Sequence, residues 1–275
     1  MDFTPPGVWG SLVSARTLLA LLVAVSVAIA MAPGATGGTA HFDVDLAPAI
    51  DTPDRPETIL GTTYTLTQLG RVDPGGTVDA TVTVGSGTDY QVEVIDAQRQ
   101  RMFLPDEGTG DGTKSIDMSV PPGSYVVAVW VDGVYEDIEP AVVSQYRVQV
   151  GGSVPTEATE GSTINVSATL DEVSGSYTRK TLDYVQVVVG DADGDVVERL
   201  SDPDGDDTYT GSVDVSSLST GQYTLYVVAR GTEEGYGDRN ELLGASDAQS
   251  FEVTEQTTTT TTTTTTSSST GGGGG

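Results

Sequence analysis

The 275-residue chain contains no cysteine, and this absence excludes several kinds of site. Without thiols, the chain has no disulfide, no thiolate metal ligand, no cysteine nucleophile and no cysteine that could carry a lipid anchor. Its stability therefore has to come from the burial of apolar side chains and from the surrounding solvent.

Basic residues are also scarce. The sequence holds 12 Lys and Arg against 40 Asp and Glu, a net charge of -28, and only Lys114 and Lys180 are lysines. A chain this negative repels nucleic acids and acidic lipid surfaces, so we exclude nucleic acid as a partner. An Asp-rich, Lys-poor surface is typical of proteins from concentrated salt, where a Debye length of about 3 Å at 1 M removes most self-repulsion. The alternative is an acidic secreted protein from a mesophile, which would usually carry more lysine.

Histidine occurs once, as His41, near the start of the chain. A catalytic triad with a histidine base would need this residue beside an activated serine, and the sequence has no G-x-S-x-G motif. Carboxylates are so abundant that a pair of them has no diagnostic value for acid–base catalysis. We therefore predict that the protein is not an enzyme and needs no cofactor for catalysis.

Residues 17–32 form an uninterrupted apolar run, preceded by Arg16. A membrane-spanning helix needs about 20 apolar residues, so this shorter run fits the apolar region of a signal peptide. Small-x-small patterns at 28–30 and 38–40 are both candidate cleavage sites, and we assign 1–40 to a signal peptide and leader. An uncleaved signal anchor is the alternative. In both cases the rest of the chain is expected outside the cell or at its surface.

Alternation of apolar and polar residues with period two dominates the sequence after residue 61. At 77–84, valine or alanine takes every second position, and threonine or aspartate takes the others. This is the pattern of half-buried antiparallel strands, and no exported segment shows apolar residues at helical spacing. We therefore predict an all-β fold.

Two stretches share a motif that divides the chain into two units. A turn leads through Gly-x-Tyr into an alternating strand at 119–131 and again at 217–229. The two tyrosines, Tyr125 and Tyr223, lie 98 residues apart, about the length of one immunoglobulin-type sandwich. A tyrosine at this place resembles the tyrosine corner of that fold, in which the phenol hydroxyl bonds to the upstream backbone. The alternative is ordinary strand entry.

The repeat sets the predicted domain boundaries. We assign 62–150 and 157–254 to two tandem immunoglobulin-like β-sandwiches, with the glycine-containing segment at 150–156 as the linker between them. Residues 41–61 are rich in proline and aspartate and are predicted to be a linker or an edge segment. Residues 255–275, rich in threonine, serine and glycine, cannot build a core and are predicted to form an extended stalk.

Two features indicate glycosylation. Asn165-Val166-Ser167 is an N-glycosylation sequon, and the alternation places Asn165 on the polar face of its strand. The threonine run that begins at Thr257 is a candidate site of O-linked sugar, which would stiffen and hydrate the stalk. The candidate residues at the start of this run are Thr257, Thr258, Thr259 and Thr260.

Four aspartates are candidate ligands for a hard cation. Asp191, Asp193 and Asp195 fall at positions 1, 3 and 5 of an EF-hand count, and Asp202 falls at position 12. The pattern departs from that motif at Val196, which replaces the glycine of position 6, and it lacks the bidentate glutamate. The alternatives are a weak Ca²⁺ or Mg²⁺ site and two acidic β-turns without a metal.

Two acidic segments, 132–144 and 231–246, follow the corner strands at equivalent places and are long for loops between adjacent strands. Loops at one end of a sandwich can form a binding surface, and the alternative is a pair of solvated connections. The candidate contact residues in these segments are Tyr135, Tyr236, Arg239 and Asn240.

An export signal, acidic immunoglobulin-like modules with a sequon, and a threonine stalk follow one another in an order that resembles the cell-surface and S-layer glycoproteins of haloarchaea. The resemblance implies a non-enzymatic spacer or lattice module of the cell envelope, with envelope proteins or glycans as partners. In that family the stalk precedes a Pro-Gly-Phe motif and a hydrophobic anchor, so a membrane link here would need an anchor absent from this sequence. The alternative function is adhesion or ligand binding through the two acidic segments, with or without a divalent cation.

Overall fold

The computed structural model describes residues 42–152, 154–237 and 239–256, and β-strands are the only regular elements in these ranges. The all-β prediction is confirmed. In the same ranges, no helix is long and apolar enough to cross a membrane. The predicted signal peptide and the threonines from Thr257 onward lie outside the described residues.

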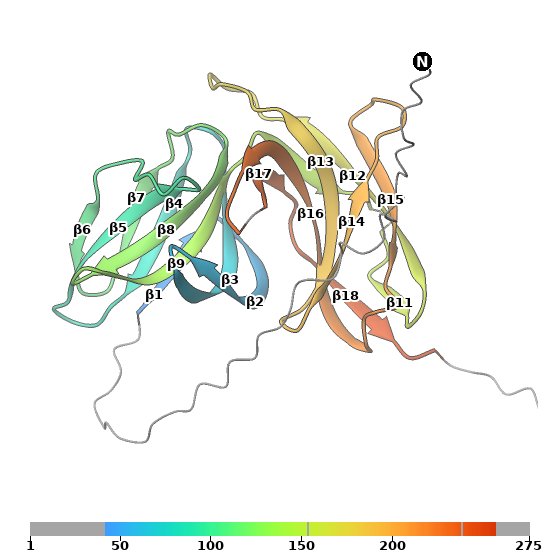
Figure 1. The fold of residues 1–275 in the computed structure, drawn as a ribbon, viewed down its shortest axis with the longest axis horizontal. Helices are drawn as coiled ribbons and strands as arrows, with labels where there is room; N and C mark the ends of the chain where they lie inside the picture. Colours follow the sequence, from blue (N-terminus) through green and yellow to red (C-terminus); the bar gives the residue numbers. More distant parts are fainter. Residues whose placement is uncertain (1–41, 153, 238, 257–275) are drawn as a thin grey trace, which may run out of the picture. The chain divides into compact units, whose positions relative to one another are not determined.

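The first half of the described chain, residues 42–143, contains two sheets (Figure 1). One has the strand order β1-β4-β7, and the other has the order β2-β3-β9-β8-β5-β6. The bounds are β1 (Asp43–Ala47), β2 (Ala49–Ile59), β3 (Thr62–Val72), β4 (Thr77–Thr83), β5 (Asp89–Asp96), β6 (Asp106–Thr109), β7 (Gly112–Asp117), β8 (Gly123–Val131) and β9 (Val134–Val143).

The second half, residues 146–254, repeats this arrangement. A sheet of order β10-β12-β15 faces a sheet of order β11-β18-β16-β13-β14, in which β17 also pairs with β16. The bounds are β10 (Tyr146–Val150), β11 (Glu157–Thr159), β12 (Thr163–Glu172), β13 (Leu182–Gly190), β14 (Asp195–Leu200), β15 (Thr208–Asp214), β16 (Gly221–Glu234), β17 (Asn240–Ala245) and β18 (Gln249–Thr254).

The alternation of apolar and polar residues in the sequence corresponds to an alternation of buried and exposed side chains along the strands. On β4, Val78, Ala80 and Val82 have no exposed surface, while the threonines and aspartate between them are exposed. Burying one such valine contributes about 1.5 to 3 kcal/mol. Each half has its own core between its two sheets, as two tandem sandwiches require. Large members of the first core are Leu46, Tyr90, Met118 and Val127, and those of the second are Ile164, Leu170, Leu225 and Phe251.

Both tyrosine corners are present. The hydroxyl of Tyr125 donates to the carbonyl oxygen of Pro121 at 2.7 Å, and that of Tyr223 donates to the carbonyl oxygen of Ser219 at 2.8 Å. Each ring is buried at the start of its strand. The prediction of two immunoglobulin-like sandwiches is confirmed at the residues that suggested it.

The boundary between the halves differs from the predicted one. Tyr146–Val150, expected to be the last strand of the first sandwich, forms β10 and pairs with β12 of the second. Val148 is buried in the second core, and the expected linker at 150–156 lies inside the second half, where the backbone N–H of Gly151 donates to Ser167. The physical reason is that alternation makes a strand amphipathic without specifying which sheet it joins.

The segment expected to be a linker or an edge, 41–61, forms β1 and β2, which lie at the edges of the two sheets of the first half. β1 pairs along its whole length with β4, and β2 pairs with β3. Thr52 to Asp54 interrupt the register of β2, so the strand bulges where Pro53 cannot donate a ladder hydrogen bond.

Candidate functional site

The turn between β13 and β14 holds three of the four candidate cation ligands, and two of their carboxylates already have partners. The Oδ1 of Asp191 accepts hydrogen bonds from the backbone N–H groups of Asp193 at 2.9 Å and Gly194 at 3.1 Å. The carboxylate of Asp195 pairs with Arg55 of the first half at 2.8 Å. These contacts stabilise a turn and a junction between the halves.

Asp202 lies in a different turn, between β14 and β15. Its Oδ1 accepts from the backbone of Gly205 at 2.7 Å, and its Oδ2 accepts from that of Asp207 at 3.1 Å. Within the described ranges, no group of three or more His, Asp or Glu side chains is placed to hold a metal ion. The structure thus does not bring the four aspartates together as ligands.

The segment 132–144 is mainly strand rather than loop. Asp132 and Gly133 both have positive φ angles, 48° and 95°, and form a two-residue hairpin turn between β8 and β9. Tyr135 follows on β9, and its hydroxyl donates to the buried carboxylate of Glu93 at 2.8 Å. The Tyr135 side chain is therefore engaged within the first sandwich.

The segment 231–246 is also a hairpin, formed by the end of β16 and by β17. At its tip, the hydroxyl of Tyr236 donates to the backbone carbonyl oxygens of Ile95 at 2.8 Å and Asp96 at 2.5 Å in the first half. Arg239 pairs with Glu57 of β2 at 3.1 Å. Both candidate contact residues thus join the two halves to each other.

Asn240, the last of the four, starts β17. Its side-chain amide donates to the carboxylate of Asp183 at 3.0 Å and to the carbonyl oxygen of Gly231 at 2.6 Å. It therefore fixes the tip of the hairpin that carries Tyr236.

The sequon residue Asn165 is exposed on β12, the middle strand of its sheet. Its side-chain oxygen accepts a hydrogen bond from Ser212 on β15 at 2.9 Å. The polar face expected for Asn165 is therefore the solvent face.

The two halves meet without a flexible linker. Only Ser144 and Gln145 separate β9 from β10, and both side chains are buried. The backbone N–H of Ser144 donates to Val72 at 2.8 Å, and the carbonyl oxygen of Gln145 accepts from Val173 at 2.8 Å. One residue is thus bonded into the first half and the next into the second.

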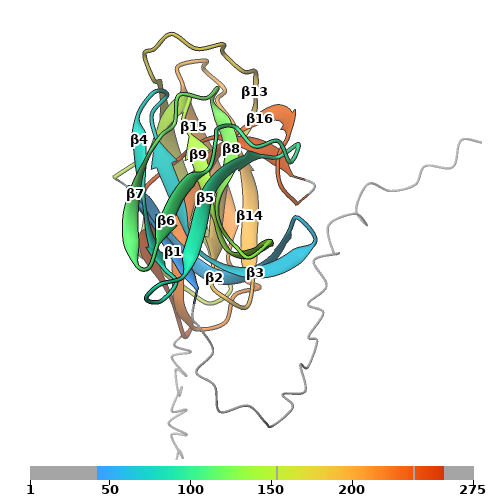
Figure 2. The ribbon, with the colours of Figure 1, turned by 90° about the vertical axis from the view of Figure 1, so that its left-hand side faces the viewer.

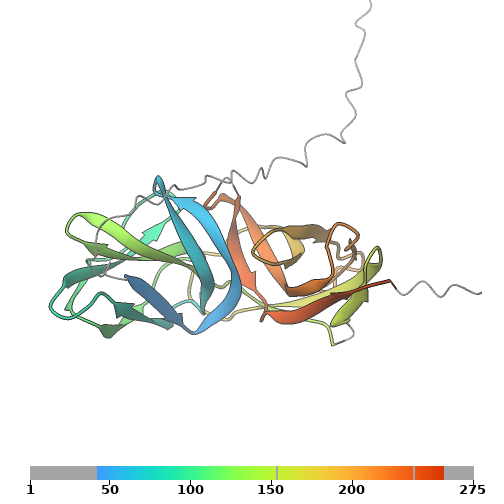
Figure 3. The same ribbon diagram turned by 90° about the horizontal axis from the view of Figure 1, so that it is seen from below.

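An apolar contact surface, here called the junction face, covers this connection. It consists of Ile50, Leu69 and Val142 from the first half and Val228 and Ala245 from the second, all buried. Figure 3 shows the β2–β3 hairpin, in blue, beside the orange to red strands that supply the second set. Apolar contact of this kind resists separation of the two sandwiches.

In the part of the chain that the structure describes, four arginines form ion pairs across the junction. Arg55 is the most enclosed, with a side chain 23% exposed, and it also donates to the carbonyl oxygens of Asp191 at 2.8 Å and Gly194 at 3.1 Å. This guanidinium therefore joins β2 to the β13–β14 turn through several charge-assisted bonds. The four pairs are Arg55 with Asp195, Arg71 with Asp247, Arg147 with Asp73, and Arg239 with Glu57.

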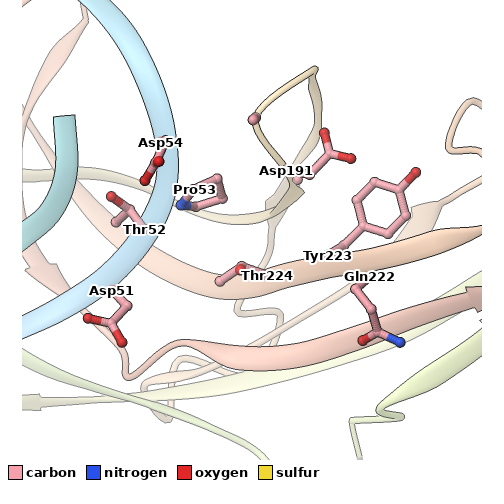
Figure 4. Close-up of a pocket in the computed structure, with 10 residues that line it drawn as sticks. Asp51, Thr52, Pro53, Asp54, Asp191, Gln222, Tyr223 and Thr224 are labelled. Carbon is pink, nitrogen blue, oxygen red and sulfur yellow. The ribbon is translucent and has the colours of Figure 1, made fainter. Parts of the chain in front are cut away.

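A pocket of about 240 Å³ lies beside this contact. Figure 4 shows Asp51, Thr52, Pro53 and Asp54 of β2 on one side and Asp191, Gln222, Tyr223 and Thr224 of the second half on the other. The pocket lining has three carboxylates and no basic side chain.

A buried carboxylate, Glu139 on β9, lies under the β2–β3 hairpin. Burial raises its pKa to about 7, against the opposing effect of hydrogen bonds from Thr67 and Gln68. The hydroxyl of Thr67 donates to Glu139 at 2.7 Å, and its backbone N–H donates at 3.1 Å. These bonds replace a ladder partner where β3 leaves the regular sheet.

No protein family and no curated protein matches the chain. Among solved structures, Yersinia pseudotuberculosis adhesin InvE is 14% identical, with a TM-score of 0.25, over 76% of this chain and 58% of that one. A tetra-tandem repeat from the extending region of a large adhesion protein is 18% identical, with a TM-score of 0.26, over 77% and 50%. An endo-β-1,4-mannanase from Thermotoga petrophila is 14% identical, with a TM-score of 0.27, over 42% and 21%.

The chain spans less than two thirds of the length of each of these structures.

Sequence reasoning missed the residues that hold the junction. Arg55 lies in a segment read as linker or edge, and Gln145 lies inside a strand-rich stretch with no distinguishing pattern. For the segment 132–144, however, the sequence does carry a signal. The Asp132-Gly133 dipeptide between alternating strands is typical of a two-residue hairpin and argues against a long loop.

Proposed function

We propose that the chain is a non-enzymatic surface module whose two sandwiches form one rigid spacer. The observation that carries this proposal is the connection through Ser144 and Gln145, which are both buried and bonded to opposite halves. A flexible tether would instead be exposed and rich in glycine and serine. A spacer has to transmit position along its length, and a buried two-residue connection with an apolar junction face supports that role.

Rigidity can be measured by electron paramagnetic resonance with a pair of spin labels. Because the sequence has no cysteine, cysteines introduced at Asp79 and Thr169 would carry the only two labels. Both positions are exposed, one on β4 and the other on β12. We expect a single narrow distance distribution. A variant with a Gly-Ser repeat inserted after Ser144 provides the broad reference, and an intact chain as broad as this reference would exclude the spacer.

We further propose that this spacer is exported and belongs to the envelope of a salt-adapted organism, as the resemblance to haloarchaeal surface glycoproteins implies. The apolar run at 17–32 supports export, and the net charge of -28 supports salt adaptation. Thermal unfolding in about 0.1 M and about 3 M KCl tests the second point, since screening should raise the midpoint of so acidic a chain. Equal midpoints would contradict it.

Glycosylation is the remaining part of the proposal. The exposed position of Asn165 on β12 supports an N-linked sugar, and the threonine run from Thr257 supports O-linked sugar on composition alone. Intact-mass measurement on the protein from its native host reports signal cleavage and added sugar together. A single mass equal to that of the unmodified 275-residue chain would contradict both.

A further inference from the structure

The first sandwich has a groove of about 570 Å³ that plays no part in the spacer function. It lies over β5, β6 and β8, which Figure 2 shows side by side. Its lining includes Trp130, Gln91 and the carboxylates of Asp89, Glu107 and Asp132. Val92, Val129 and Val131 alternate with these residues and point into the core, so the groove belongs to the outer face of the sheet.

The strand register aligns the central groove residues in one row. Gln91 on β5 is paired with Glu107 of β6 on one side and with Trp130 of β8 on the other. Side chains opposite one another on adjacent strands are close enough to contact the same ligand. The groove therefore presents the indole of Trp130, the amide of Gln91 and the carboxylate of Glu107 in one row.

Within the described ranges, no cation pairs with a carboxylate of the groove. Asp89 accepts a hydrogen bond from Thr109 at 2.6 Å, and Glu107 has only a long contact of 3.5 Å with Gln91. The nearby Lys114 pairs with Asp106 and donates to the backbone of Glu107, not to its carboxylate. Over the residues that the structure describes, none of the side chains that line the groove is basic.

The second sandwich has an arginine on β14, the strand equivalent to β6. Val228 lies five residues after its corner tyrosine, as Trp130 does, and Gln186 is paired with both Val228 and Arg199. Arg199 therefore occupies the position equivalent to Glu107. Its guanidinium lies 3.9 Å from the ring centroid of Tyr184, in a cation–π contact.

We propose that the groove over β5, β6 and β8 binds an organic cation, a guanidinium or alkylammonium group, against Trp130. In the second sandwich Arg199 lies over the ring of Tyr184, whereas the first sandwich has a carboxylate, Glu107, at the position equivalent to Arg199. The indole π-system and the three carboxylates attract the same sign of charge. A neutral ligand would cover carboxylates without compensating their charge.

The test follows the indole N–H signal of Trp130 by NMR in the whole chain at constant ionic strength, with Trp130→Phe used to assign it. One arm uses N-acetyl-arginine amide, which represents a basic side chain of a partner protein, and another uses tetramethylammonium, which represents a free small cation. N-acetyl-citrulline amide is the neutral match of the first, and a neutral disaccharide tests sugar binding. We expect saturable shifts with the cations alone, and the tighter cation identifies the source.

Three substitutions make the test specific. Glu107→Gln should weaken cation binding at least fivefold, and Glu107→Arg should abolish it by placing a fixed positive charge in the row with Gln91 and Trp130. Glu198→Gln removes one exposed charge from β14, outside the groove, and should leave binding unchanged. Glu107 is exposed on an edge strand, so these variants should fold, which a far-ultraviolet circular dichroism spectrum verifies.

The proposal is overturned if neither cation shifts the signal saturably, or if the citrulline or sugar probe binds as tightly. It is also overturned if Glu107→Arg binds cations like the unmodified chain. Equal weakening by Glu107→Gln and Glu198→Gln would show that only the net charge matters, and that result would likewise overturn it.

Discussion

The side-chain amide of Gln145 forms two hydrogen bonds with the backbone of Lys180, accepting from its N–H at 2.7 Å and donating to its carbonyl oxygen at 2.9 Å. A neighbouring β-strand would bind the backbone of Lys180 in the same way, with one carbonyl acceptor and one N–H donor. Gln145 is 1% exposed and lies at the connection between the halves, so this one side chain fixes the segment before β13 against the junction.

Removing this amide should destabilise the protein. Gln145→Ala leaves the part-buried backbone N–H and carbonyl of Lys180 without these partners, which costs about 1 to 3 kcal/mol of unfolding free energy. Urea denaturation at constant salt measures the change. Gln149→Ala is the matched control, because that exposed glutamine has only one long contact with Asp171, and it should have little effect. Equal losses for the two variants would refute the role given to Gln145.

The corner tyrosines allow a comparison between the two sandwiches. Tyr125→Phe and Tyr223→Phe each remove one hydroxyl hydrogen bond while keeping the ring, so each should lower the unfolding free energy by about 0.5 to 1.5 kcal/mol. Tyr146→Phe is the control, since no hydrogen bond is made by that hydroxyl in the described structure. A Tyr146 variant as unstable as the other two would mean that the corner bonds contribute nothing specific.

The sequence predicted those features of the fold that are encoded locally. Alternation along β4 and the motif leading to Tyr125 and Tyr223 depend on neighbouring residues alone, and the structure has both. The sheet to which β10 belongs depends on whether Val148 is buried in the core formed by the preceding residues or in the core formed by the following residues. Nothing in the five residues of β10 specifies that choice.

The junction could not be predicted for a related reason. Arg239 and Glu57 are 182 positions apart, and acidic residues are so common that any arginine has many candidate partners. On the sequence, Tyr236 and Arg239 are candidate contact residues because aromatic and guanidinium groups suit binding. In the structure, the Tyr236 hydroxyl and the Arg239 guanidinium instead bind groups of the first half, so both side chains act between the two halves.

Arg55 and Arg147 should differ although each forms one ion pair across the junction. Arg55→Gln removes an enclosed guanidinium that also serves two carbonyl oxygens, so a loss of about 1.5 to 3 kcal/mol is expected. The side chain of Arg147 is 64% exposed, and Arg147→Gln should leave the denaturation midpoint nearly unchanged. Urea denaturation of the two variants side by side decides the point, and a larger effect at Arg147 would contradict the ranking.

Glu139 should make the stability of the first sandwich depend on pH. Its pKa in the folded state is raised from 4.5 to about 7 by burial, so between these values the folded protein holds a proton that the unfolded chain has released. The associated stability is fully present below about pH 4.5 and is lost as the pH rises through about 7.

Glu139→Gln removes this titration while retaining a side-chain oxygen that can accept from Thr67. We therefore expect the variant to gain stability relative to the unmodified protein when urea denaturation is moved from pH 5 to pH 8. Comparing the two proteins at each pH cancels the contribution of the other carboxylates. A difference that is constant with pH, or that changes in the opposite direction, would show that Glu139 is already ionised in the folded state at pH 5.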